Sequence, residues 1–388
     1  MQAVLLAAGR STRTYPLTST RPKPLIPIWD RPLLEHQLGQ LAGLVDEAIL
    51  VVGYRHEQIE SHFGSEHRGI RLRYAEQETQ RGTADALLTA RPYISERSLV
   101  LNGDDFYHHA DLETLLEGGR GLLVTQAPDP QNRAVVRCEL DAVIDIVEKP
   151  LNPEPGALCS VGGYCIEHAD LKLLDDLPLS PRGELELPDF ILRLVRDSKV
   201  RPQPITQWWL PLTYGWDVLT AIHHIWADPN HAKDLGIAET GHGASRARIV
   251  DFDFDSASFG EDVGLEGPIR LGDGVRLGDG VLLVGPTTIG AGCSIGDGVR
   301  VEGSALFDNV HIGAGATVLD SVLGEGVEIG KGAILSSASG RELTIDVKGK
   351  RVHPKLDRLG AVVGDGARVS DGSVVDAGSL IDAGARLT

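Results

Sequence analysis

A short apolar strand, a glycine and two separated cations open the chain and together predict an anion-binding loop. The segment LLAAGRSTRTYPLTSTRPKPLIPI spans residues 5–28, and Gly9 follows its strand. Glycine permits a tight turn, after which the backbone N–H groups of residues 10–13 can face an anion. Arg13 and Lys23 are spaced so that both can converge on that anion. The pattern therefore favours the binding of phosphate groups.

This segment closely resembles the nucleoside-triphosphate loop of the sugar nucleotidylyltransferases. Their pattern runs Leu-Ala-Ala-Gly-x-Gly-Thr-Arg, then Pro-Leu-Thr, then Pro-Lys-Pro. Ser11 stands where the family has its second glycine, so the loop here is expected to be stiffer. The resemblance implies that Arg13 and Lys23 hold the leaving pyrophosphate. The nucleotide-binding residues that it implies in this loop are Ala7, Ala8, Gly9, Arg10, Ser11 and Thr12.

A second family element is YAEQETQRGTADALL, in which Gln77 lies five residues before Gly82 and Thr83. In the resembling enzymes this glutamine reads the base and the glycine backbone approaches it. All three residues are therefore nucleotide-binding by resemblance, and Thr83 also suits the start of a helix. An amide at this spacing favours a pyrimidine, whereas RGTADA also resembles the adenylyl- and guanylyl-transferring relatives. The choice of base stays open.

Two separated aspartates are the expected metal ligands. LVLNGDDFY ends a predicted strand with Gly103 and Asp104, and the family's Gly-Asp at this place contacts the nucleotide and supplies a carboxylate for Mg²⁺. Asp105 is a second candidate that is better interpreted as a solvated or capping neighbour. The implied partner is Asp217, in TYGWDVLTAI. Mg²⁺ prefers a few carboxylates together with phosphate oxygens, which suits two aspartates from separate segments.

The sugar side of the predicted site departs from the family's usual pattern. By resemblance, Glu148 in IVEKP accepts hydrogen bonds from sugar hydroxyls and Lys149 contacts the sugar phosphate; a surface ion pair is the simpler interpretation of both. Ala134 stands where many members have glycine, and Ser160, shortly before Gly162, stands where many have asparagine. These positions usually touch the sugar. They suggest an unusual sugar, or a sugar-like cyclitol phosphate, as the substrate.

The implied reaction is attack of a sugar 1-phosphate oxygen on the α-phosphorus of a nucleoside triphosphate, with release of pyrophosphate. A phosphate dianion is already nucleophilic, so the reaction depends on in-line positioning and charge neutralisation rather than on a general base. Lys149 would align the nucleophile. The expected partners are thus a nucleoside triphosphate, a sugar or cyclitol 1-phosphate, and Mg²⁺ as the cofactor.

Short apolar runs alternate with helical stretches over the first part of the chain, which places these motifs at strand ends. AVLLAA, EAILVVG, SLVLNG, GLLVTQ and AVIDIVE predict buried strands, and LLEHQLGQLAGL, ADALLTARPYI and DLETLLEGG predict helices between them. This alternation is typical of an α/β fold with a mixed, mostly parallel sheet, Rossmann-like in this family. We expect a catalytic domain over residues 1–228 and a connector over residues 229–262.

A six-residue period over residues 263–388 predicts a left-handed parallel β-helix of hexapeptide repeats. The predicted inward positions are Val263, Ile269, Val275, Val281, Thr287, Cys293, Val299 and Ala305, then after a five-residue step Val310, Ala316, Val322, Val327 and Ala333. A third run holds Ala361, Ala367, Ser373, Ser379 and Ala385. The polar segment 335–360 interrupts the period and predicts an extruded loop with one hairpin strand, ELTIDVKG.

The whole arrangement resembles bifunctional enzymes that join a nucleotidylyltransferase to an acyltransferase. Their acyltransferase uses His and Tyr before an Asp-Ser-x-x-Gly turn, which is present here as DSVLG; Ala314 and Thr317 occupy the His and Tyr places. We therefore expect an inactive acyl-transfer site and a β-helix that serves homo-oligomer assembly, based on trimers. A retained acetyl-CoA-dependent activity and a non-catalytic nucleotide-sugar-binding regulator remain the alternatives.

Composition narrows the remaining partners. A formal net charge of −18 disfavours nucleic acid and anionic membranes, because phosphate backbones need a basic face. Four widely spaced cysteines without metal-ligand spacing are typical of reduced core residues in a cytoplasmic protein. No transmembrane segment is expected, since the apolar opening is far too short to span a bilayer.

Overall fold

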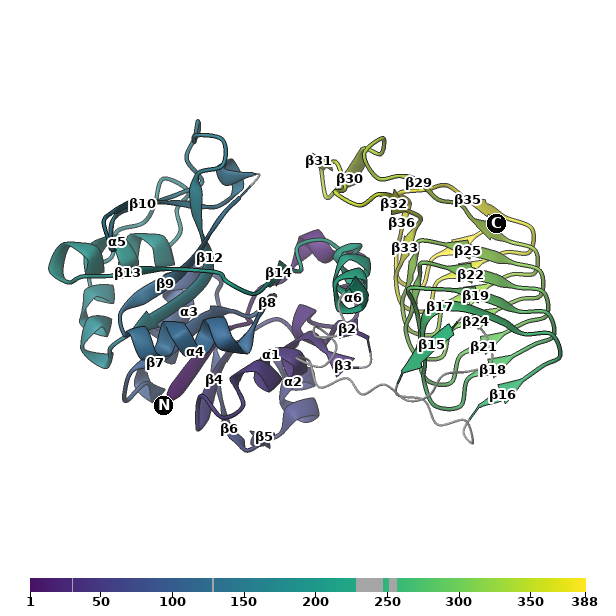
Figure 1. Ribbon diagram of the computed structural model, residues 1–388, viewed down its shortest axis with the longest axis horizontal. Helices are drawn as coiled ribbons and strands as arrows, with labels where there is room; N and C mark the ends of the chain where they lie inside the picture. Colours follow the sequence, from purple (N-terminus) through teal and green to yellow (C-terminus); the bar gives the residue numbers. More distant parts are fainter. Residues whose placement is uncertain (30, 128, 228–246, 251–256) are drawn as a thin grey trace. The chain divides into compact units, whose positions relative to one another are not determined.

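The computed structural model describes residues 1–29, 31–127, 129–227, 247–250 and 257–388 (Figure 1). The described chain divides into two compact units. The first consists of Met1–Arg10 and Leu34–Pro211, and the second of Ser11–Leu33 and Leu212–Thr388. Most of the predicted connector lies outside the described residues, and the predicted domain boundaries stay predictions.

The first unit is built on one mixed sheet with a parallel centre. Four parallel strands lie in the order β7 (Ser98–Asn102), β1 (Gln2–Leu6), β4 (Glu47–Val52) and β6 (Ile70–Glu76). Antiparallel pairs add β5 (Glu66–His67), β12 (Leu158–Ile166), β10 (Ala134–Glu139), β11 (Ala142–Glu148) and β9 (Gly121–Gln126). Strand β13 (Arg201–Pro204) runs parallel to β9, and β8 (Asp105–Tyr107) pairs with β14 (Trp209–Pro211). A mixed sheet is what the sequence predicts, and its parallel part lies mainly at the centre.

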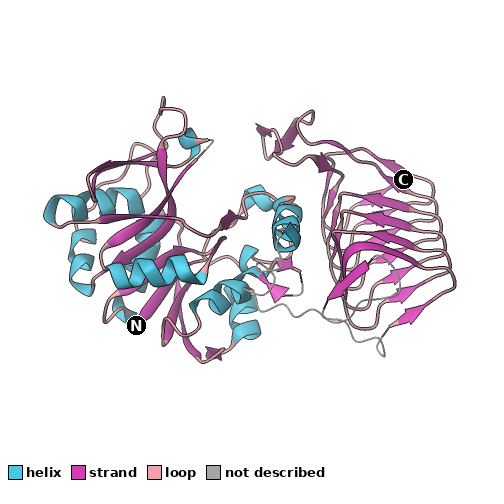
Figure 2. Cartoon of the chain, in the orientation of Figure 1, coloured by secondary structure: helices cyan, strands magenta, loops and turns pink. Residues whose placement is uncertain are grey.

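Both faces of the central strands are buried. Side chains alternate across a strand, and the neighbours Val4 and Leu5 are both fully buried. The covering helices are α1 (Leu33–Leu41), α2 (His56–Phe63), α3 (Thr83–Ala90), α4 (His109–Gly118) and α5 (Leu187–Asp197), drawn in cyan in Figure 2. Helix α3 contacts β1, β4 and β6, whereas α4 contacts β7, β9 and β12. Near-continuous apolar strands are therefore required, as in AVLL and EAILVV.

The second unit contains a β-helix of three parallel sheets (Figure 1). Its first sheet consists of β15 (Ala247–Val250), the end of β17 (Gly264–Leu271), β20 (Thr287–Ile289), β23 (Ala305–Leu306), β26 (Val322–Leu323), β33 (Val362–Val363) and β36 (Leu380–Ile381). Its second sheet consists of β16 (Ser258–Phe259), β18 (Arg276–Leu277), β21 (Ser294–Ile295), β24 (His311–Ile312), β27 (Glu328–Ile329), β34 (Arg368–Val369) and β37 (Arg386–Leu387). Its third sheet consists of the start of β17, β19 (Leu282–Val284), β22 (Arg300–Glu302), β25 (Thr317–Leu319), β28 (Ile334–Leu335) and β35 (Val374–Val375).

The five-residue steps of the β-helix fall one residue earlier than the sequence predicts. Ser304 and Ser321, both fully buried, take the inward positions that were expected for Ala305 and Val322. The Thr287 hydroxyl accepts a hydrogen bond from the Ser304 backbone N–H at 3.3 Å, and the Ser304 hydroxyl accepts one from the Ser321 N–H at 3.0 Å. This ladder satisfies the hydroxyl groups in the core, so serine is tolerated there.

Ala305 and Val322 are buried although they face outward. Their row on the first sheet continues to Val362, and all three side chains are at most 1% exposed. A Cβ atom on Gly215 would lie 3.1 Å from Val362 Cγ1, so the segment before helix α6 (Asp217–Ala227) packs on this row at Val362. The prediction was wrong by one residue here because apolar residues occupy both sides of the sheet.

Two further segments complete the second unit. Residues 11–33 form the 3₁₀ turns Thr12–Thr14 and Lys23–Leu25 and the short pair β2 (Pro27–Ile28) and β3 (Arg31–Pro32). The polar loop predicted at 335–360 contains β29 (Ala338–Ser339), paired with β32 (Arg358–Leu359), and the hairpin β30 (Ile345–Val347) and β31 (Lys350–Val352). Among the described residues, no helix is long and apolar enough to cross a membrane.

Candidate active site

A pocket of about 480 Å³ opens in the first unit beyond the ends of β1, β4 and β6. Its lining residues are Arg10, Gly53, Tyr54, Glu76, Gln77, Glu78, Thr79 and Gln80. A Cβ atom on Gly53 would lie 2.9 Å from the Ala8 carbonyl oxygen and 3.2 Å from that of Gln77. The three strand ends therefore approach closely, which only glycine permits at this place. Predicted nucleotide-binding residues from two separate motifs thus line one pocket or contact its wall.

Gln77 is held in one orientation within this pocket. Its side chain is buried, and its amide nitrogen donates to Asp85 Oδ2 at 2.8 Å and to the Gly82 carbonyl at 3.3 Å. A carboxylate accepts hydrogen bonds only, so Asp85 selects the amide orientation. Gly82 has φ 120°, and a Cβ atom there would lie 2.2 Å from the Leu185 carbonyl oxygen. The Thr83 hydroxyl accepts the backbone N–H of Leu187 at 2.9 Å, which joins the predicted base-binding segment to the start of α5.

Gly103 and Asp104 follow the end of β7, beside the end of β1. The Gly103 N–H donates to the Leu6 carbonyl at 3.0 Å, and a Cβ atom on Gly103 would lie 2.7 Å from the same oxygen. Asp104 is half-buried. Asp105 is buried rather than solvated, and its carboxylate accepts the Tyr107 hydroxyl at 3.3 Å. Asp105 is therefore hydrogen-bonded within the protein, and Asp104 stays the predicted ligand.

Glu148 and its neighbours form a charged group on the sugar side. Glu148 pairs in register with Ala134 across β10 and β11, so two residues predicted for the sugar lie side by side. The Lys149 ammonium contacts Glu148 Oε1 at 2.9 Å, so the predicted ion pair forms. Arg182, a residue that the sequence reasoning missed, approaches the same oxygen at 3.7 Å. The sequence feature that could have indicated Arg182 is its position just before the acidic segment that starts at Glu184.

Arg182 is held among carboxylates. Its guanidinium pairs with Glu186 at 2.9 Å. Burial acts to lower the pKa of Arg182, but the hydrogen bond to Glu186 and the charge of Glu148 outweigh it and raise the pKa. Burial, with help from Glu186 and Glu148, raises the pKa of Asp189. The sugar side thus carries fixed positive and negative groups within hydrogen-bonding distance of one another.

Ser160 lies in the protein interior, where its hydroxyl is hydrogen-bonded. The side chain is buried, its hydroxyl donates to the Tyr164 hydroxyl at 3.1 Å, and it accepts the Gly162 N–H at 3.2 Å. Gly162 has φ 78°, and a Cβ atom there would lie 1.9 Å from the Asn102 side-chain nitrogen. Glycine is required at 162, and Ser160 offers no amide where many family members have one.

Three predicted residues interact electrostatically in the second unit: Arg13, Lys23 and Asp217. Lys23 is buried and begins a 3₁₀ turn, and Asp217 begins helix α6. Asp217 Oδ2 accepts the N–H groups of Thr213 at 2.7 Å and Tyr214 at 2.8 Å. Burial raises the pKa of Asp217 to about 6, and these hydrogen bonds and the charges of Lys23 and Arg13 oppose the rise. Both cations therefore act electrostatically on the Asp217 carboxylate.

Ser11 adopts the left-handed backbone conformation that the family's glycine suits, with φ 50° and ψ 51°. Its carbonyl accepts the Thr14 N–H at 3.1 Å, the Thr14 hydroxyl at 2.8 Å and the Thr18 hydroxyl at 3.0 Å. A non-glycine residue in this region costs about 1–2 kcal/mol. The three hydrogen bonds offset that cost, so the loop accommodates serine.

The two parts of the chain match different families. The Nucleotidyl transferase family matches residues 2–228, and the GMPPB C-terminal domain matches residues 265–383. The chain belongs to the nucleotidyl transferase family. Two solved structures show the same fold, a putative glucose-1-phosphate thymidylyltransferase from Bacillus anthracis (TM-score 0.52, 24% identity) and a UDP-glucose pyrophosphorylase (TM-score 0.51, 19% identity). Each match covers 57% of this chain, and they cover 93% and 96% of those chains respectively.

Curated relatives of this nucleotidyl transferase include several archaeal proteins. The "Bifunctional protein GlmU" of Methanococcus maripaludis is 35% identical over 223 residues, which are 57% of this chain and 53% of that protein. The "UTP--glucose-1-phosphate uridylyltransferase AglF" of Haloferax volcanii is 33% identical over 228 residues, 56% of this chain and 93% of the relative. A "Bifunctional sugar-1-phosphate nucleotidylyltransferase/acetyltransferase" of Sulfurisphaera tokodaii is 28% identical over 267 residues, which are 66% of this chain and 64% of that protein. The match therefore spans about half the length of the Methanococcus relative.

The predicted metal ligands of this nucleotidyl transferase, Asp104 and Asp217, are carboxylates, a ligand type that Mg²⁺ prefers. Within the described ranges, no group of three or more His, Cys, Asp or Glu side chains is arranged to hold a metal ion. Mg²⁺ is bound by one or two carboxylates together with water and substrate phosphates. Burial raises the pKa of Asp217, so a cation beside it would favour the charged form. Asp217 therefore fits a cation ligand.

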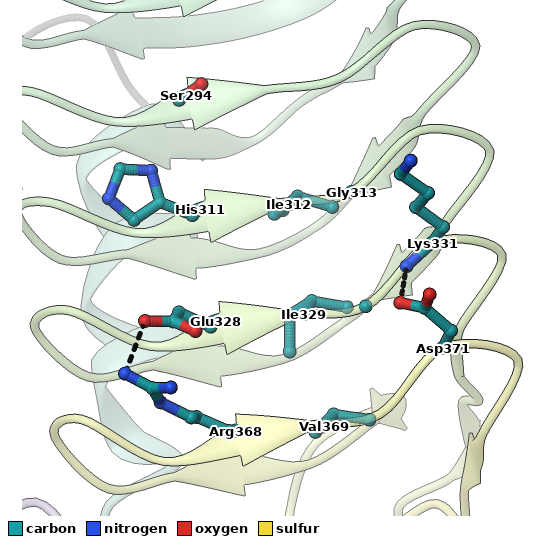
Figure 3. Close-up of a pocket in the computed structure, with 11 residues that line it drawn as sticks. Ser294, His311, Ile312, Gly313, Glu328, Ile329, Lys331, Arg368, Val369 and Asp371 are labelled. Carbon is teal, nitrogen blue, oxygen red and sulfur yellow. Dashed lines mark hydrogen bonds and ion pairs between the residues drawn. The ribbon is translucent and has the colours of Figure 1, made fainter.

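A second pocket, of about 380 Å³, lies on the second sheet of the β-helix (Figure 3). The side chains of His311, Glu328 and Arg368 project outward from neighbouring strands there, and Arg368 pairs with Glu328 at 3.0 Å. Its remaining lining residues are Ser294, Ile312, Gly313, Ile329, Gly330, Lys331, Val369 and Asp371. No residue predicted for the nucleotidyl transferase site lies in this pocket.

Proposed function

We propose that this protein transfers the nucleotidyl group of a nucleoside triphosphate to a sugar or cyclitol 1-phosphate and releases pyrophosphate. The observation that carries the proposal is the electrostatic interaction of Arg13 and Lys23 with the buried Asp217, in a chain of the nucleotidyl transferase family. Two cations beside a buried carboxylate are what a triphosphate with a bound metal requires. The names of the archaeal relatives, which act on sugar 1-phosphates, support the same chemistry.

In the proposed mechanism each group neutralises or orients a phosphate. Arg13 and Lys23 hold the pyrophosphate that leaves, and Lys149 aligns the attacking sugar phosphate. Asp104 and Asp217 would hold Mg²⁺, which when bound neutralises charge on the triphosphate. No general base is required, because the attacking phosphate is already an anion. The rate enhancement then comes from positioning and from electrostatic stabilisation.

The proposed acceptor is an unusual sugar phosphate or a cyclitol phosphate. The Ser160 hydroxyl is bonded to Tyr164 and Gly162, so this position does not present the amide that contacts common hexoses in many relatives. Ala134, beside Glu148, adds a methyl group where many relatives have none. Both changes alter the contacts to a ring. If glucose 1-phosphate or N-acetylglucosamine 1-phosphate proves the best acceptor in a panel, this part of the proposal is wrong.

The test is pyrophosphate release with Mg²⁺, in which five nucleoside triphosphates are crossed with sugar and cyclitol 1-phosphates. One productive pair is expected, and chelation of Mg²⁺ should abolish its signal. Lys23→Ala should lower kcat/KM by about 10²–10³-fold, as loss of one preorganised charge contact does. Lys331→Ala, an exposed lysine on the β-helix, is the matched control and should leave the rate unchanged. Silence across the panel from folded protein would contradict the proposal.

The β-helix is proposed to assemble the protein into a homo-oligomer, based on trimers, and to lack acyl transfer. Ile334 and Val374 are paired on the third sheet and are 41% and 64% exposed, which supports burial against another copy. Val374→Arg should lower the mass measured by sedimentation, whereas His311→Arg on the second sheet should not. An unchanged mass for both variants would contradict assembly through this sheet. Acetyl transfer from acetyl-CoA, measured as released thiol, would contradict the inactive site.

A reducing compartment, the cytoplasm, is proposed for the protein. All four cysteines, Cys138, Cys159, Cys165 and Cys293, are free thiols in the structure, and the last three are buried. Disulfides are rare in the cytosol, so four free thiols in one chain support this location.

A further inference from the structure

The segment that carries Lys23 contacts the β-helix through Arg21. Within the second unit, the Arg21 guanidinium contacts Asp365 Oδ2 from Nη2 at 2.6 Å and from Nε at 3.2 Å. Arg21 Nη2 also reaches Glu325 Oε2 at 3.0 Å. The Thr20 hydroxyl donates to the same Asp365 oxygen. One β-helix carboxylate therefore accepts from two consecutive residues of the segment.

This ion pair is partly removed from water. The side chains of Arg21 and Asp365 are each 14% exposed. The Arg21 guanidinium also lies 5.4 Å from the centre of the buried Phe307 ring, at a cation–π distance. A charge pair that is shielded and held by two hydrogen bonds is stronger and more directional than an exposed one. It can therefore hold the chain in one position.

A second contact holds the same segment six residues earlier. The Lys348 ammonium lies 3.5 Å from the centre of the Tyr15 ring. The Tyr15 hydroxyl is hydrogen-bonded to Asp382, and burial followed by this bond raises the pKa of Tyr15 to about 12. A Cβ atom on Gly364 would lie 3.1 Å from Pro16 Cβ. The segment is thus attached to the β-helix at both ends of residues 15–21.

Arg21 is separated from Lys23 by one proline. Proline fixes φ near −65°, so the path from Arg21 to Lys23 has little freedom. The N–H of Leu25 donates to the Pro22 carbonyl at 3.0 Å, and that of Ile26 donates to the Lys23 carbonyl at 3.0 Å. Lys23 is 3% exposed. A shift of Arg21 is therefore transmitted to Lys23.

We propose that Arg21 is a positioning residue, and that its ion pair with Asp365 and Glu325 sets the place of Lys23 for the triphosphate. The β-helix then takes part in nucleotidyl transfer through this ion pair. This inference rests on the proposed function. Misplacement of a charge by about 1 Å can cost about 10²-fold in rate, so a remote carboxylate can matter.

The β-helix offers a matched control for Asp365. Asp365 Oδ1 accepts the Glu325 N–H at 2.8 Å, and Asp371 Oδ1 accepts the Lys331 N–H at 2.8 Å in an equivalent turn (Figure 3). Asparagine keeps this acceptor oxygen and removes the charge. Asp365→Asn and Asp371→Asn therefore disturb the β-helix equally, but only Asp365→Asn removes the charge opposite Arg21.

The experiment compares the full-length variants by amide hydrogen exchange and by kinetics. Asp365→Asn should increase exchange in residues 12–26 at least threefold and raise KM for the nucleoside triphosphate about tenfold. KM for the sugar phosphate should stay the same. Asp371→Asn should change none of these quantities. Arg21→Gln should reproduce the effect of Asp365→Asn, and Arg21→Lys, which keeps the charge, should recover part of it.

Each other outcome overturns the inference. Unchanged exchange in Asp365→Asn would mean that the ion pair does not hold the segment. Increased exchange with unchanged nucleotide kinetics, or equal effects from Asp371→Asn, would mean that its role is structural only. If no nucleotide–sugar pair reacts, the proposed function fails separately. The inference is then decided by the affinity for inorganic tripolyphosphate, which Asp365→Asn should weaken about tenfold.

Discussion

The first and second sheets of the β-helix have the same backbone repeat but opposite outer surfaces. On the first sheet the outward row contains Thr288, Ala305, Val322 and Val362, all of which are at most 3% exposed. On the second sheet the equivalent row contains Ser294, His311, Glu328 and Arg368 (Figure 3). Inward residues of both sheets share one apolar core. The difference shows that the repeat specifies the fold, whereas the outward side chains decide whether a sheet is covered.

The strongest test of this comparison places a charge in each row. Val362→Asp should lower the free energy of unfolding by about 4 kcal/mol, because it buries an unpaired carboxylate. Ser294→Asp, at a half-buried outward position on the second sheet, should change it by less than about 0.5 kcal/mol, because the carboxylate can still reach water. Urea denaturation of both variants measures the difference. Similar losses in the two variants would show that the first sheet is not covered in solution.

A smaller effect should distinguish inward from outward serines. Ser304→Ala removes the hydroxyl that accepts the Ser321 N–H, so a buried donor loses its partner. We expect a loss of about 1–3 kcal/mol in the free energy of unfolding. Ser294→Ala, at an outward position, should leave stability unchanged. If Ser304→Ala is equally neutral, the assigned phase of the β-helix would need revision.

The smallest predicted effect concerns the core that the two sheets share. Cys293 points into this core, and burial raises the pKa of its thiol to about 12, above the ordinary value of 9.0. The folded state then keeps the proton while the unfolded state loses it. Stability from this group is complete below pH 9 and is lost as pH rises from 9 toward 12, by about 1 kcal/mol at pH 10. Urea denaturation at pH 8 and pH 10 should show this loss, and Cys293→Ala should reduce it.

The fold class could be predicted from sequence because its signals are local. A strand, a glycine and a cationic segment follow one another within residues 5–28, and the six-residue period needs no partner to be recognised. The exact phase could not be predicted. Apolar Ala305 and Val322 follow polar Ser304 and Ser321, and hydrophobicity alone assigns the apolar residue to the core. The assignment fails because the outer face of the first sheet is also buried, so apolar residues occur on both of its faces.

Long-range charge contacts account for the residues that sequence reasoning missed at the candidate site. Arg182 meets Glu148 across more than thirty residues, and Arg21 meets Asp365 across 344 positions. Neither pair has a spacing in the sequence that would identify its two residues as contact partners. Ser160 and Ser11 could be recognised as departures from the family pattern, but not the hydrogen bonds that accommodate them. Motifs identify which residue types are present, whereas the partners that orient them depend on the folded chain.

Ser11–Leu33 belongs to the second unit, and this limits how domains of such proteins can be exchanged by recombination. The family match ends at residue 228, which would be the natural place for recombination between genes. A crossover at residue 228 would separate Arg21 from its partner Asp365, and Gly215 from its neighbour Val362. The Haloferax relative is matched over 93% of its length by 56% of this chain. Exchange at residue 228 would therefore join surfaces that never adapted to each other.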